Sequence, residues 1–233
     1  MGPGKFIVIF GMMVVAGTAL AAGTAELSTQ KDKASYAIGM DIANSIKKNG
    51  VEVDPDVLGK AIKDVFTGQK TLLTDQEAKT TLQELQKEMK AKQQEKMKVL
   101  GEKNKKEGDA FLAANMKKEG VKTLPSGLQY KVITEGKGKS PSVTDTVTVQ
   151  YTGSLVDGTE FDSSYKRGQA ATFAVKSVIK GWTEALQMMK EGSKWRIFLP
   201  PNLAYGETGI GGGLIGPNAT LIFDVELVSV KAK

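Results

Sequence analysis

The sequence predicts an α+β protein: an N-terminal helical region, a long connecting α-helix and a C-terminal antiparallel β-sheet wrapped on one short helix. Three observations support this fold class. Apolar residues recur at helical spacing through the first half of the chain. No proline occurs between Pro55 and Pro125, so a long helix is permitted there. Beyond Leu128 the pattern changes to an alternation of apolar and polar residues, which is typical of strands.

The first residues have the pattern of a signal peptide, predicted here as residues 1–21. Lys5 precedes the apolar run Phe6–Val15, and Ala19 and Ala21 then occupy the small-residue positions of a cleavage site. An uncleaved membrane anchor is the alternative, because the rest of the segment carries no charge. A cleaved signal predicts an exported protein, located in the periplasm or at the outer membrane surface of a bacterium.

Composition excludes several kinds of chemistry. The 233 residues include no cysteine and no histidine, which rules out thiol nucleophiles, disulfides, cysteine-based zinc sites and a Ser-His-Asp triad. We therefore expect neither a metal nor a cofactor.

The formal net charge is +6, but between Thr74 and Glu119 there are 11 Lys against 9 Asp and Glu, without interleaved aromatics. This mixture favours a solvated helical surface over a nucleic-acid groove.

Two short helices are predicted within residues 26–73. The first has Ser35 as a possible N-cap and Gly50 as its stop. The second begins with Asp54 as N-cap and Pro55 in the first helical position, and ends at Gly68. Both helices carry broad apolar stripes that little else in the chain can cover. We expect them to form a helical dimerisation domain against a second copy of the chain, with a self-contained three-helix bundle as the alternative.

A long connecting helix is predicted over residues 74–119. Thr74 and Glu77 form a capping box at its start. Beyond Met89 the apolar residues become sparse and the surface is rich in Lys, Glu and Gln. Gly101 and Gly108 weaken this half of the helix, which we interpret as a spacer without a core of its own.

The remaining segment, residues 126–231, is predicted to be a sheet domain. Strict alternation places Val147, Val149 and Tyr151 on one face of a strand, and Asp157-Gly158 is a strong hairpin turn. Two later strands are indicated by "KWRIFLP" and "TLIFDVELVSV". Between the hairpin and these strands lies one short helix, predicted from about Trp182 to Met189 and closed by Gly192.

The stretch "GGGLIG", Gly211–Gly216, has the G-x-G-x-x-G spacing of a dinucleotide-binding loop. Such a loop needs a following helix to hold the pyrophosphate, but here Pro217, Asn218 and then a strand follow. The acidic residue expected about 20 positions later would fall beyond Lys233. We therefore reject nucleotide binding. The glycine-dense loop, with Leu214 and Ile215 at its tip, is instead predicted to be a flap over an apolar pocket.

Three stretches resemble FKBP-type peptidyl-prolyl cis/trans isomerases: "VQYTGSLVDGTEFDSS", "VIKGWTEALQMMKEG" and "LAYGETGIGGGLIGPNATLIFDVELVSV". The resemblance covers residues 126–231, and the helical half with "SYAIGMDIA" is similar to the Mip-like (macrophage infectivity potentiator-like) branch. It implies an FKBP-like fold and an exported bacterial protein that forms a homodimer through its N-terminal helices. The expected partners are proline-containing polypeptides and the macrolide inhibitors of the family.

The resemblance also implies a pocket. Trp182 would form its floor, and the Ile179 backbone amide would face the ligand. Asp162 and Tyr205 would be its polar groups, and Arg167 would pair with Asp162. The implied catalytic residues are Asp162, Tyr205 and Tyr151, and the implied substrate-binding residues are Phe161, Phe173, Val178, Ile179, Trp182, Leu214, Ile215 and Phe223.

The implied reaction suits this composition. Amide resonance gives X-Pro bond rotation a barrier of about 18–20 kcal/mol, but no bond is broken, so neither a nucleophile nor a metal is needed. A dry aromatic pocket favours the twisted, less dipolar amide. The alternatives are a dimeric holdase chaperone that grips apolar-Pro segments with little catalysis, and a purely structural dimerisation protein. Taken singly, the aromatic positions are also typical of an ordinary core.

Overall fold

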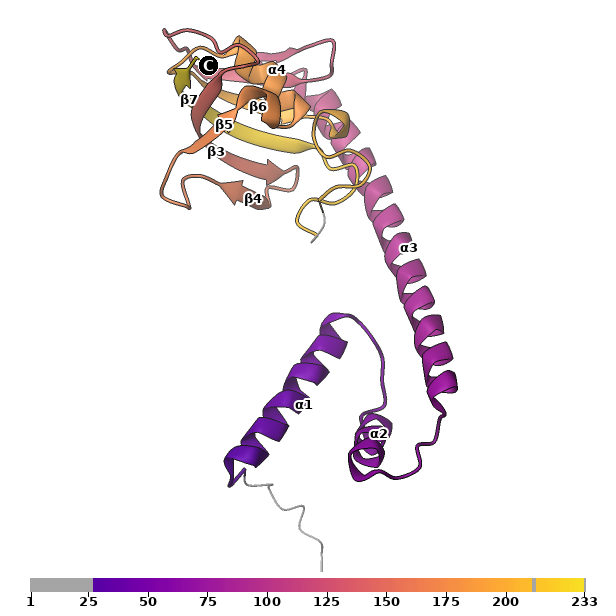
Figure 1. The fold of residues 1–233 in the computed structure, drawn as a ribbon. Helices are drawn as coiled ribbons and strands as arrows, with labels where there is room; N and C mark the ends of the chain where they lie inside the picture. Colours follow the sequence, from indigo (N-terminus) through magenta and orange to yellow (C-terminus); the bar gives the residue numbers. More distant parts are fainter. Residues whose placement is uncertain (1–26, 211–212, 233) are drawn as a thin grey trace, which may run out of the picture. The chain divides into compact units, whose positions relative to one another are not determined.

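The computed structural model describes residues 27–210 and 213–232, and the elements are drawn in Figure 1. The predicted signal peptide lies outside the described residues. The chain divides into two compact units, Met1–Leu72 and Leu73–Lys233. Within the described residues, no helix combines the length and the apolar character that crossing a membrane requires.

The described part of the first unit, from residue 27 onward, contains two helices, α1 (Gln30–Lys48) and α2 (Pro55–Thr67). Helix α1 begins earlier than predicted, because Thr29 and Asp32 form a reciprocal capping box. Ser35 therefore does not cap the helix but lies inside it, where its hydroxyl donates to the carbonyl oxygen of Lys31 at 2.9 Å. A serine within a helix commonly makes this bond to the preceding turn.

Helix α2 has the boundaries that its sequence predicts. The carboxylate of Asp54 accepts from the backbone N–H of Asp56 at 2.9 Å, and Pro55 occupies the first turn. Gly68 ends the helix in the left-handed region with φ 66°, a conformation that glycine adopts without a steric cost.

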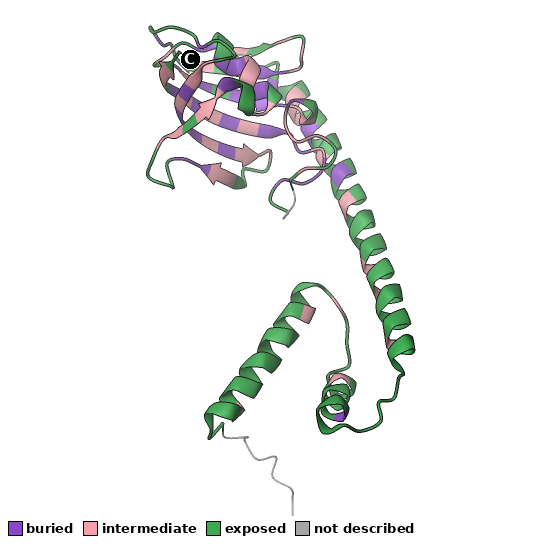
Figure 2. Cartoon of the chain, viewed as in Figure 1, coloured by how far each residue is buried: buried purple, intermediate pink, exposed green. Residues whose placement is uncertain are grey.

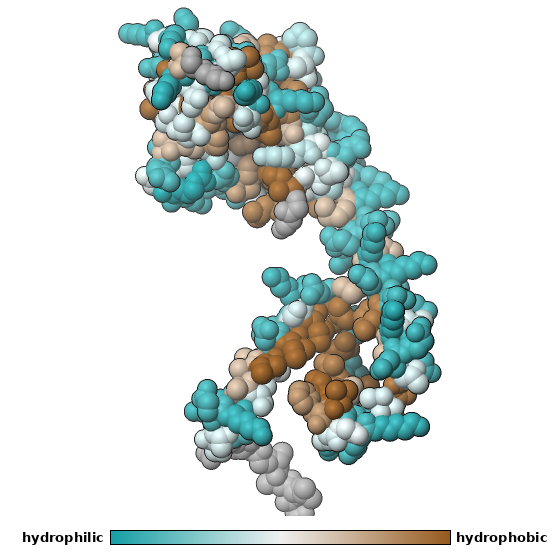
Figure 3. Space-filling model, in the orientation of Figure 1, coloured by the Kyte–Doolittle hydropathy of each residue, from teal (hydrophilic) through white to brown (hydrophobic). Residues whose placement is uncertain are grey.

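The apolar stripes of α1 and α2 are open to solvent. Figure 2 shows both helices mainly exposed, and Figure 3 shows hydrophobic residues gathered on them. No residue of α1 is buried, and Phe66 in α2 is 87% exposed. The exposed apolar residues of the two helices are Tyr36, Ile38, Met40, Ile42, Val57, Ile62, Val65 and Phe66.

The second unit begins with the long helix α3 (Asp75–Asn115), whose start has the predicted Thr74–Glu77 capping box. Its buried residues are Gly101, Gly108 and Asn115, which are spaced seven apart and therefore share one face. Figure 2 shows burial only along this later part. The sequence-based interpretation of this half as a spacer is thus wrong. It packs against the rest of the unit through the close approach of Gly101 and Gly108 and through Phe111, whose ring centroid lies 5.9 Å from that of Phe198 in β6.

The described second unit also contains a seven-stranded antiparallel sheet with the order β1-β2-β6-β7-β3-β4, in which β5 also pairs with β3. The short strands β1 and β5 are not evident in the sequence pattern, whereas β4 follows the predicted Asp157-Gly158 turn and pairs with β3. The strands are β1 (Val121–Thr123), β2 (Gln129–Thr134), β3 (Thr146–Leu155), β4 (Glu160–Ser163), β5 (Ala171–Ala174), β6 (Lys194–Leu199) and β7 (Leu221–Lys231).

One short helix, α4 (Lys180–Met188), packs on the sheet (Figure 1). It begins two residues before the predicted Trp182. The fit is close: a Cβ added at Gly181 would lie 2.3 Å from Cδ2 of Leu199 in β6. Trp182 and Leu186 point from α4 into the core that the sheet and helix share. Two 3₁₀ turns, η1 (Val175–Ser177) and η2 (Pro201–Leu203), flank this region.

Candidate active site

A cavity of about 360 Å³ lies where α4 meets the sheet. Strands β3, β4, β5 and β7 contribute its walls, α4 and the residues before it contribute the floor, and the segment after η2 contributes one side. The lining residues are Tyr151, Phe161, Asp162, Phe173, Ser177, Val178, Ile179, Trp182, Tyr205 and Phe223.

Trp182 is the centre of the aromatic lining. Its side chain is 4% exposed, and three other rings meet it nearly edge-on. The centroid distances are 5.1 Å to Tyr151, 5.3 Å to Phe223 and 6.1 Å to Phe173. Edge-to-face contacts of this kind place the positive edge of one ring against the negative face of another, which is a favourable arrangement. The rings therefore support one another and hold the indole in one orientation.

A glycine makes room for the opposite wall. Gly153 of β3 faces Asp162 of β4 on one side and Phe223 of β7 on the other. A Cβ at Gly153 would lie 2.7 Å from ring atoms of both Phe161 and Phe223. Those two rings meet edge-on with a centroid distance of 5.6 Å. The missing side chain is thus what lets this aromatic pair close over the strand.

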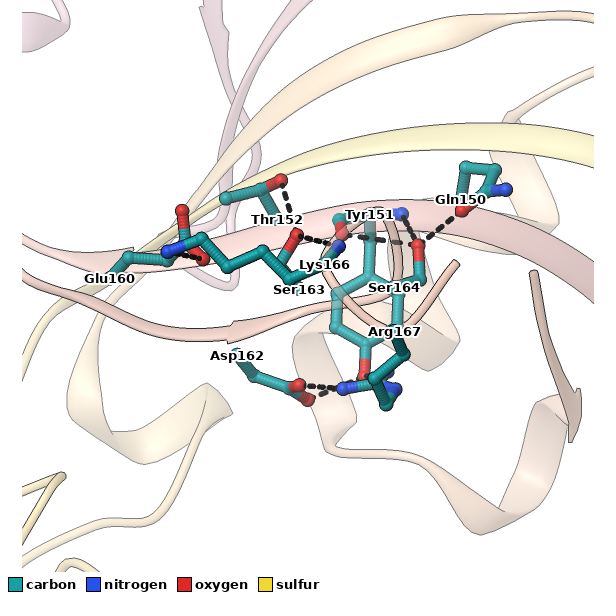
Figure 4. A network of polar contacts seen from close by, with 9 residues as sticks. All are labelled: Gln150, Tyr151, Thr152, Glu160, Asp162, Ser163, Ser164, Lys166 and Arg167. Atoms are coloured by element: carbon teal, nitrogen blue, oxygen red, sulfur yellow. Dashed lines mark hydrogen bonds and ion pairs between the residues drawn. The ribbon is translucent and has the colours of Figure 1, made fainter. Parts of the chain in front are cut away.

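A polar edge completes the cavity (Figure 4). The hydroxyl of Tyr151 donates to Oδ2 of Asp162 at 2.5 Å, and Nη2 of Arg167 donates to the Tyr151 hydroxyl oxygen at 2.9 Å. Nη1 of Arg167 forms an ion pair with Oδ1 of Asp162. Both carboxylate oxygens of Asp162 therefore have partners, and its negative charge is compensated.

The environment shifts the pKa of each group in this network. Burial raises the pKa of Asp162, but the hydrogen bonds from Tyr151 and Arg167 and the charge of Arg167 outweigh it, so the net pKa is below the ordinary value. Burial, reinforced by Asp162, raises the pKa of Tyr151. The hydrogen bond to Asp162 raises the pKa of Arg167. Near neutral pH, Asp162 is ionised and Tyr151 keeps its proton.

Ser164 holds the backbone beneath this network. It is fully buried, and its hydroxyl accepts from the backbone N–H of Tyr151 at 2.8 Å and donates to Oε1 of Gln150 at 2.5 Å. The backbone N–H of Ser164 donates to the Tyr151 carbonyl at 3.0 Å. These bonds, drawn in Figure 4, fix the end of β4 against β3 and thereby place Asp162 beside Tyr151.

Tyr205 and Ile179 line the cavity from two other segments of the chain. Burial, with a contribution from the charge of Asp162, raises the pKa of Tyr205, so this phenol also keeps its proton. Ile179 precedes α4 in an extended conformation, and its carbonyl accepts from the N–H of Trp182 at 2.9 Å.

Comparisons with known proteins cover nearly the whole chain. The model of the "domain amino terminal to FKBP-type peptidyl-prolyl isomerase" matches residues 31–132, and that of the "FKBP-type peptidyl-prolyl cis-trans isomerase" matches residues 137–228. The chain is 49% identical to the outer membrane protein MIP of Legionella longbeachae over 97% of both chains. It is also 49% identical to the peptidyl-prolyl cis-trans isomerase Mip of Coxiella burnetii, over 93% of this chain and 94% of the relative.

The chain belongs to the family of FKBP-type peptidyl-prolyl cis-trans isomerases. It is an enzyme of this type, and its similarity is to the Mip-like members. The crystal structure of FkpA from Escherichia coli aligns with a TM-score of 0.69 at 41% identity, covering 88% of this chain and 98% of that one. A peptidyl-prolyl cis-trans isomerase structure from Pseudomonas syringae aligns with a TM-score of 0.53 and covers 56% of this chain and 96% of that one.

In this isomerase, the structure brings together all but two of the predicted site residues. The exceptions are Leu214 and Ile215, which were expected in a flap over the pocket but do not line the cavity. Ile215 is 4% exposed and belongs to the core, while Leu214 is 67% exposed. Burial of Ile215 beside the sheet fixes this part of the loop, because an apolar side chain in the core resists removal to water.

Sequence reasoning missed three residues that shape the isomerase cavity. Ser177 lines it directly before the predicted Val178. Gly153 and Ser164 act through the residues that they contact. Gly153 interrupts a strictly alternating strand, and glycine at such a position is a recognised signal of close approach.

Proposed function

We propose that the cavity is the site at which this isomerase rotates X-Pro bonds, with the proline ring seated on Trp182. The observation that supports this most is the convergence of aromatic rings from three strands on the indole of Trp182 in α4, beside a charge-compensated polar edge. A volume of about 360 Å³ suits a short peptide segment more than a large cofactor.

The aromatic walls supply the environment that favours rotation. The planar amide is more dipolar than the twisted one, so exchanging water for rings disfavours the ground state relative to the transition state. Trp182, Phe223 and Phe161 form this apolar surface. Val178 and Phe173 complete the substrate contacts.

Asp162 orients other groups and does not transfer protons. Its lowered pKa makes it a weak base, and both of its oxygens already accept from Tyr151 and Arg167. Isomerisation requires no proton transfer, so a fixed carboxylate is compatible with the reaction. Its role is to hold the Tyr151 hydroxyl and to keep the polar edge in place.

Tyr205 and Ile179 are the proposed donors to the bound peptide. The raised pKa of Tyr205 keeps a proton available to a substrate carbonyl at neutral pH. The Ile179 backbone N–H is the proposed second donor. Two donors on separate sides of the cavity would hold the backbone on either side of the rotating bond.

The deciding experiment is a proline-limited refolding assay with substoichiometric amounts of the mature chain, comparing Tyr205→Phe with Tyr165→Phe. Tyr165 is 47% exposed, lies outside the cavity and has its own hydroxyl partner in Glu226. We expect the unaltered chain and Tyr165→Phe to accelerate refolding equally, and Tyr205→Phe to be several-fold slower. Equal rates for the two variants would remove Tyr205 from the site. No acceleration by any of them, with aggregation still suppressed, would instead support a holdase.

Family macrolides are expected to compete for the same cavity. Because Trp182 forms its floor, binding should change indole fluorescence and inhibit refolding catalysis over the same concentration range. Inhibition without a change in the Trp182 signal would place the inhibitor elsewhere.

The proposed working form is an exported homodimer that acts on exported proline-containing proteins. Residues 1–21 are proposed to be a cleaved signal, supported by their sequence pattern. The exposed apolar faces of α1 and α2 support pairing of two N-terminal regions, because apolar surfaces of this extent are seldom left in water. The mass of the protein isolated from the periplasm of an expression host tests the cleavage.

A further inference from the structure

Residues Gly216–Thr220, here called the loop stem, run against helix α3 before they enter strand β7. All of them are buried except Asn218, which is partly exposed. A Cβ at Gly101 would lie 3.1 Å from Cβ of Pro217, and one at Gly108 would lie 2.3 Å from Oγ1 of Thr220. Glycine costs a helix about 1 kcal/mol relative to alanine. The contacts give a physical reason for its presence, because a side chain at Gly108 would displace the stem.

Two side-chain amides connect the loop stem to the helix. Nδ2 of Asn104 donates to the carbonyl oxygen of Pro217 at 2.8 Å. Nδ2 of Asn218 approaches the carbonyl oxygen of Gly101 at 3.4 Å, which makes it the weaker of the two contacts. Because Pro217 is buried, removing its Asn104 donor would leave a polar group without its partner away from water.

Asn218 links this attachment to the cavity. Its φ of 55° is left-handed, a conformation that asparagine tolerates better than most residues. In this conformation its backbone N–H donates to the carbonyl oxygen of Gly206 at 2.9 Å. Gly206 directly follows Tyr205, which lines the cavity. A continuous series of contacts therefore runs from Asn104 through Pro217 and Asn218 to the backbone that carries Tyr205.

From these contacts we infer that Asn104 is a positioning residue for the isomerase reaction. By holding Pro217 against α3, it keeps the Asn218–Gly206 bond in register and thus sets where the Tyr205 hydroxyl meets the substrate. The later part of α3 is then a part of the catalytic unit and not only a connector. This inference rests on the proposed role of Tyr205.

Asn115 provides a matched control on the same face of α3. It is 1% exposed, and its Nδ2 donates to Oε1 of Gln129 at 2.9 Å, so it too bonds the helix to the sheet unit, but not to the loop stem. In the full chain, we expect Asn104→Ala to lower kcat/KM about three- to tenfold, the effect of losing one hydrogen bond to a buried partner. Asn115→Ala should stay within about twofold of the unaltered chain, although both variants lose thermal stability.

Two further measurements separate positioning from general loosening. The amide NMR signals of Tyr205 and Gly206 should move in Asn104→Ala and stay in place in Asn115→Ala. In a double-mutant cycle, Asn104→Ala should cost less in a Tyr205→Phe background than alone, since the two residues act through one contact.

Each result has one consequence. Equal losses of kcat/KM in Asn104→Ala and Asn115→Ala, or strictly additive effects of Asn104→Ala and Tyr205→Phe, would overturn the positioning role. An unchanged rate in Asn104→Ala, with a reduced rate in Tyr205→Phe, overturns it while leaving the proposed function standing. An unchanged rate in Tyr205→Phe removes Tyr205 from the proposed site and, with it, the route by which Asn104 would act.

Discussion

The hydroxyl of Tyr151 donates to the carboxylate of Asp162 at 2.5 Å, across the neighbouring strands β3 and β4. Arg167 binds both groups and lies over the Tyr151 ring, 5.5 Å from its centroid. The phenol must be protonated to donate, and the carboxylate must be ionised to pair with the guanidinium. Their shifted pKa values satisfy both conditions over a wide range of pH. The polar edge of the cavity is therefore a fixed structure and not a pair that titrates near neutrality.

Replacing Asp162 by Leu should lower kcat/KM about three- to tenfold while the fold is retained, because Tyr151 and Arg167 lose their shared acceptor. Asp224→Leu is the matched control. Asp224 also pairs with an arginine, Arg196, at 2.6 Å, but lies away from the cavity. The two variants are compared by the rate at which each catalyses cis/trans exchange of a proline peptide, measured by NMR. A loss as large in Asp224→Leu would show that any broken Asp–Arg pair has this effect.

The network also predicts a pH dependence. The folded-state pKa of Asp162 lies below its unfolded value, so its contribution to stability is present above the unfolded pKa and is lost as pH falls through the folded one. We expect isomerase activity and cavity stability to be level near neutrality and to fall only below about pH 4. Asp162→Asn has no carboxylate at this position, so its stability and activity should fall less in acid than those of the unaltered chain. Activity is measured by NMR exchange of a proline peptide and stability by denaturant unfolding, each over a range of pH. An identical decrease below about pH 4 in the variant and in the unaltered chain would contradict this role of Asp162.

At alkaline pH, the shifted pKa values of two tyrosines affect stability in the opposite direction. Burial raises the pKa of Tyr151 and Tyr205, so their protonated forms are favoured in the folded state. That contribution is complete below the unfolded pKa and is lost as pH rises through the folded one. The activity profile should therefore stay level at least to about pH 10, because the raised pKa values keep these hydroxyls protonated beyond the ordinary range of tyrosine.

Local sequence signals predicted the elements whose ends depend on neighbouring residues. Asp54, Pro55 and Gly68 bound α2 as expected, because a cap, a fixed φ and a left-handed glycine act within one turn. The predicted start of α1 at Ser35 was wrong, because Thr29 and Asp32 together cap the helix six residues earlier. Two capping candidates in one segment compete, and the reciprocal box has two bonds where a lone serine has one.

Contacts between distant residues were beyond local patterns. Asn104 meets Pro217 across 113 positions of sequence, and nothing in either segment indicates the other. The glycines of α3 looked like weak points in a helix, whereas Gly108 is where the helix touches Thr220. The cavity residues came from family resemblance. Leu214 and Ile215 do not line the cavity in this structure, and Ile215 is buried in the core instead, a contact that no local pattern indicates.

Gly153→Ala should damage the cavity more than its small size suggests. The added methyl would meet Phe161 and Phe223 at 2.7 Å, so one ring must move and the wall opens. We expect a loss in kcat/KM of about tenfold or more and a loss of stability of about 1–3 kcal/mol. Adding Phe161→Leu removes one of the clashing rings and should restore stability in part without restoring full activity. If Gly153→Ala alone keeps full activity, the Phe161–Phe223 wall does not take part in catalysis.

The exposed faces of α1 and α2 give the final prediction, that charged substitutions there dissociate the proposed dimer. Phe66 and Val65 are 87% and 67% exposed, so changing them costs the isolated fold little but would bury charge in an interface. Phe66→Asp and Val65→Asp should each shift the mature chain toward the monomer in sedimentation equilibrium. Val143→Asp is the control, an exposed apolar position at 44% in the sheet unit. Monomeric Val143→Asp, or dimeric Phe66→Asp and Val65→Asp, would place the interface elsewhere. All residues that line the cavity belong to the second unit of a single chain. Unchanged catalysis of a small proline peptide by the monomeric variants would therefore show that each cavity works alone.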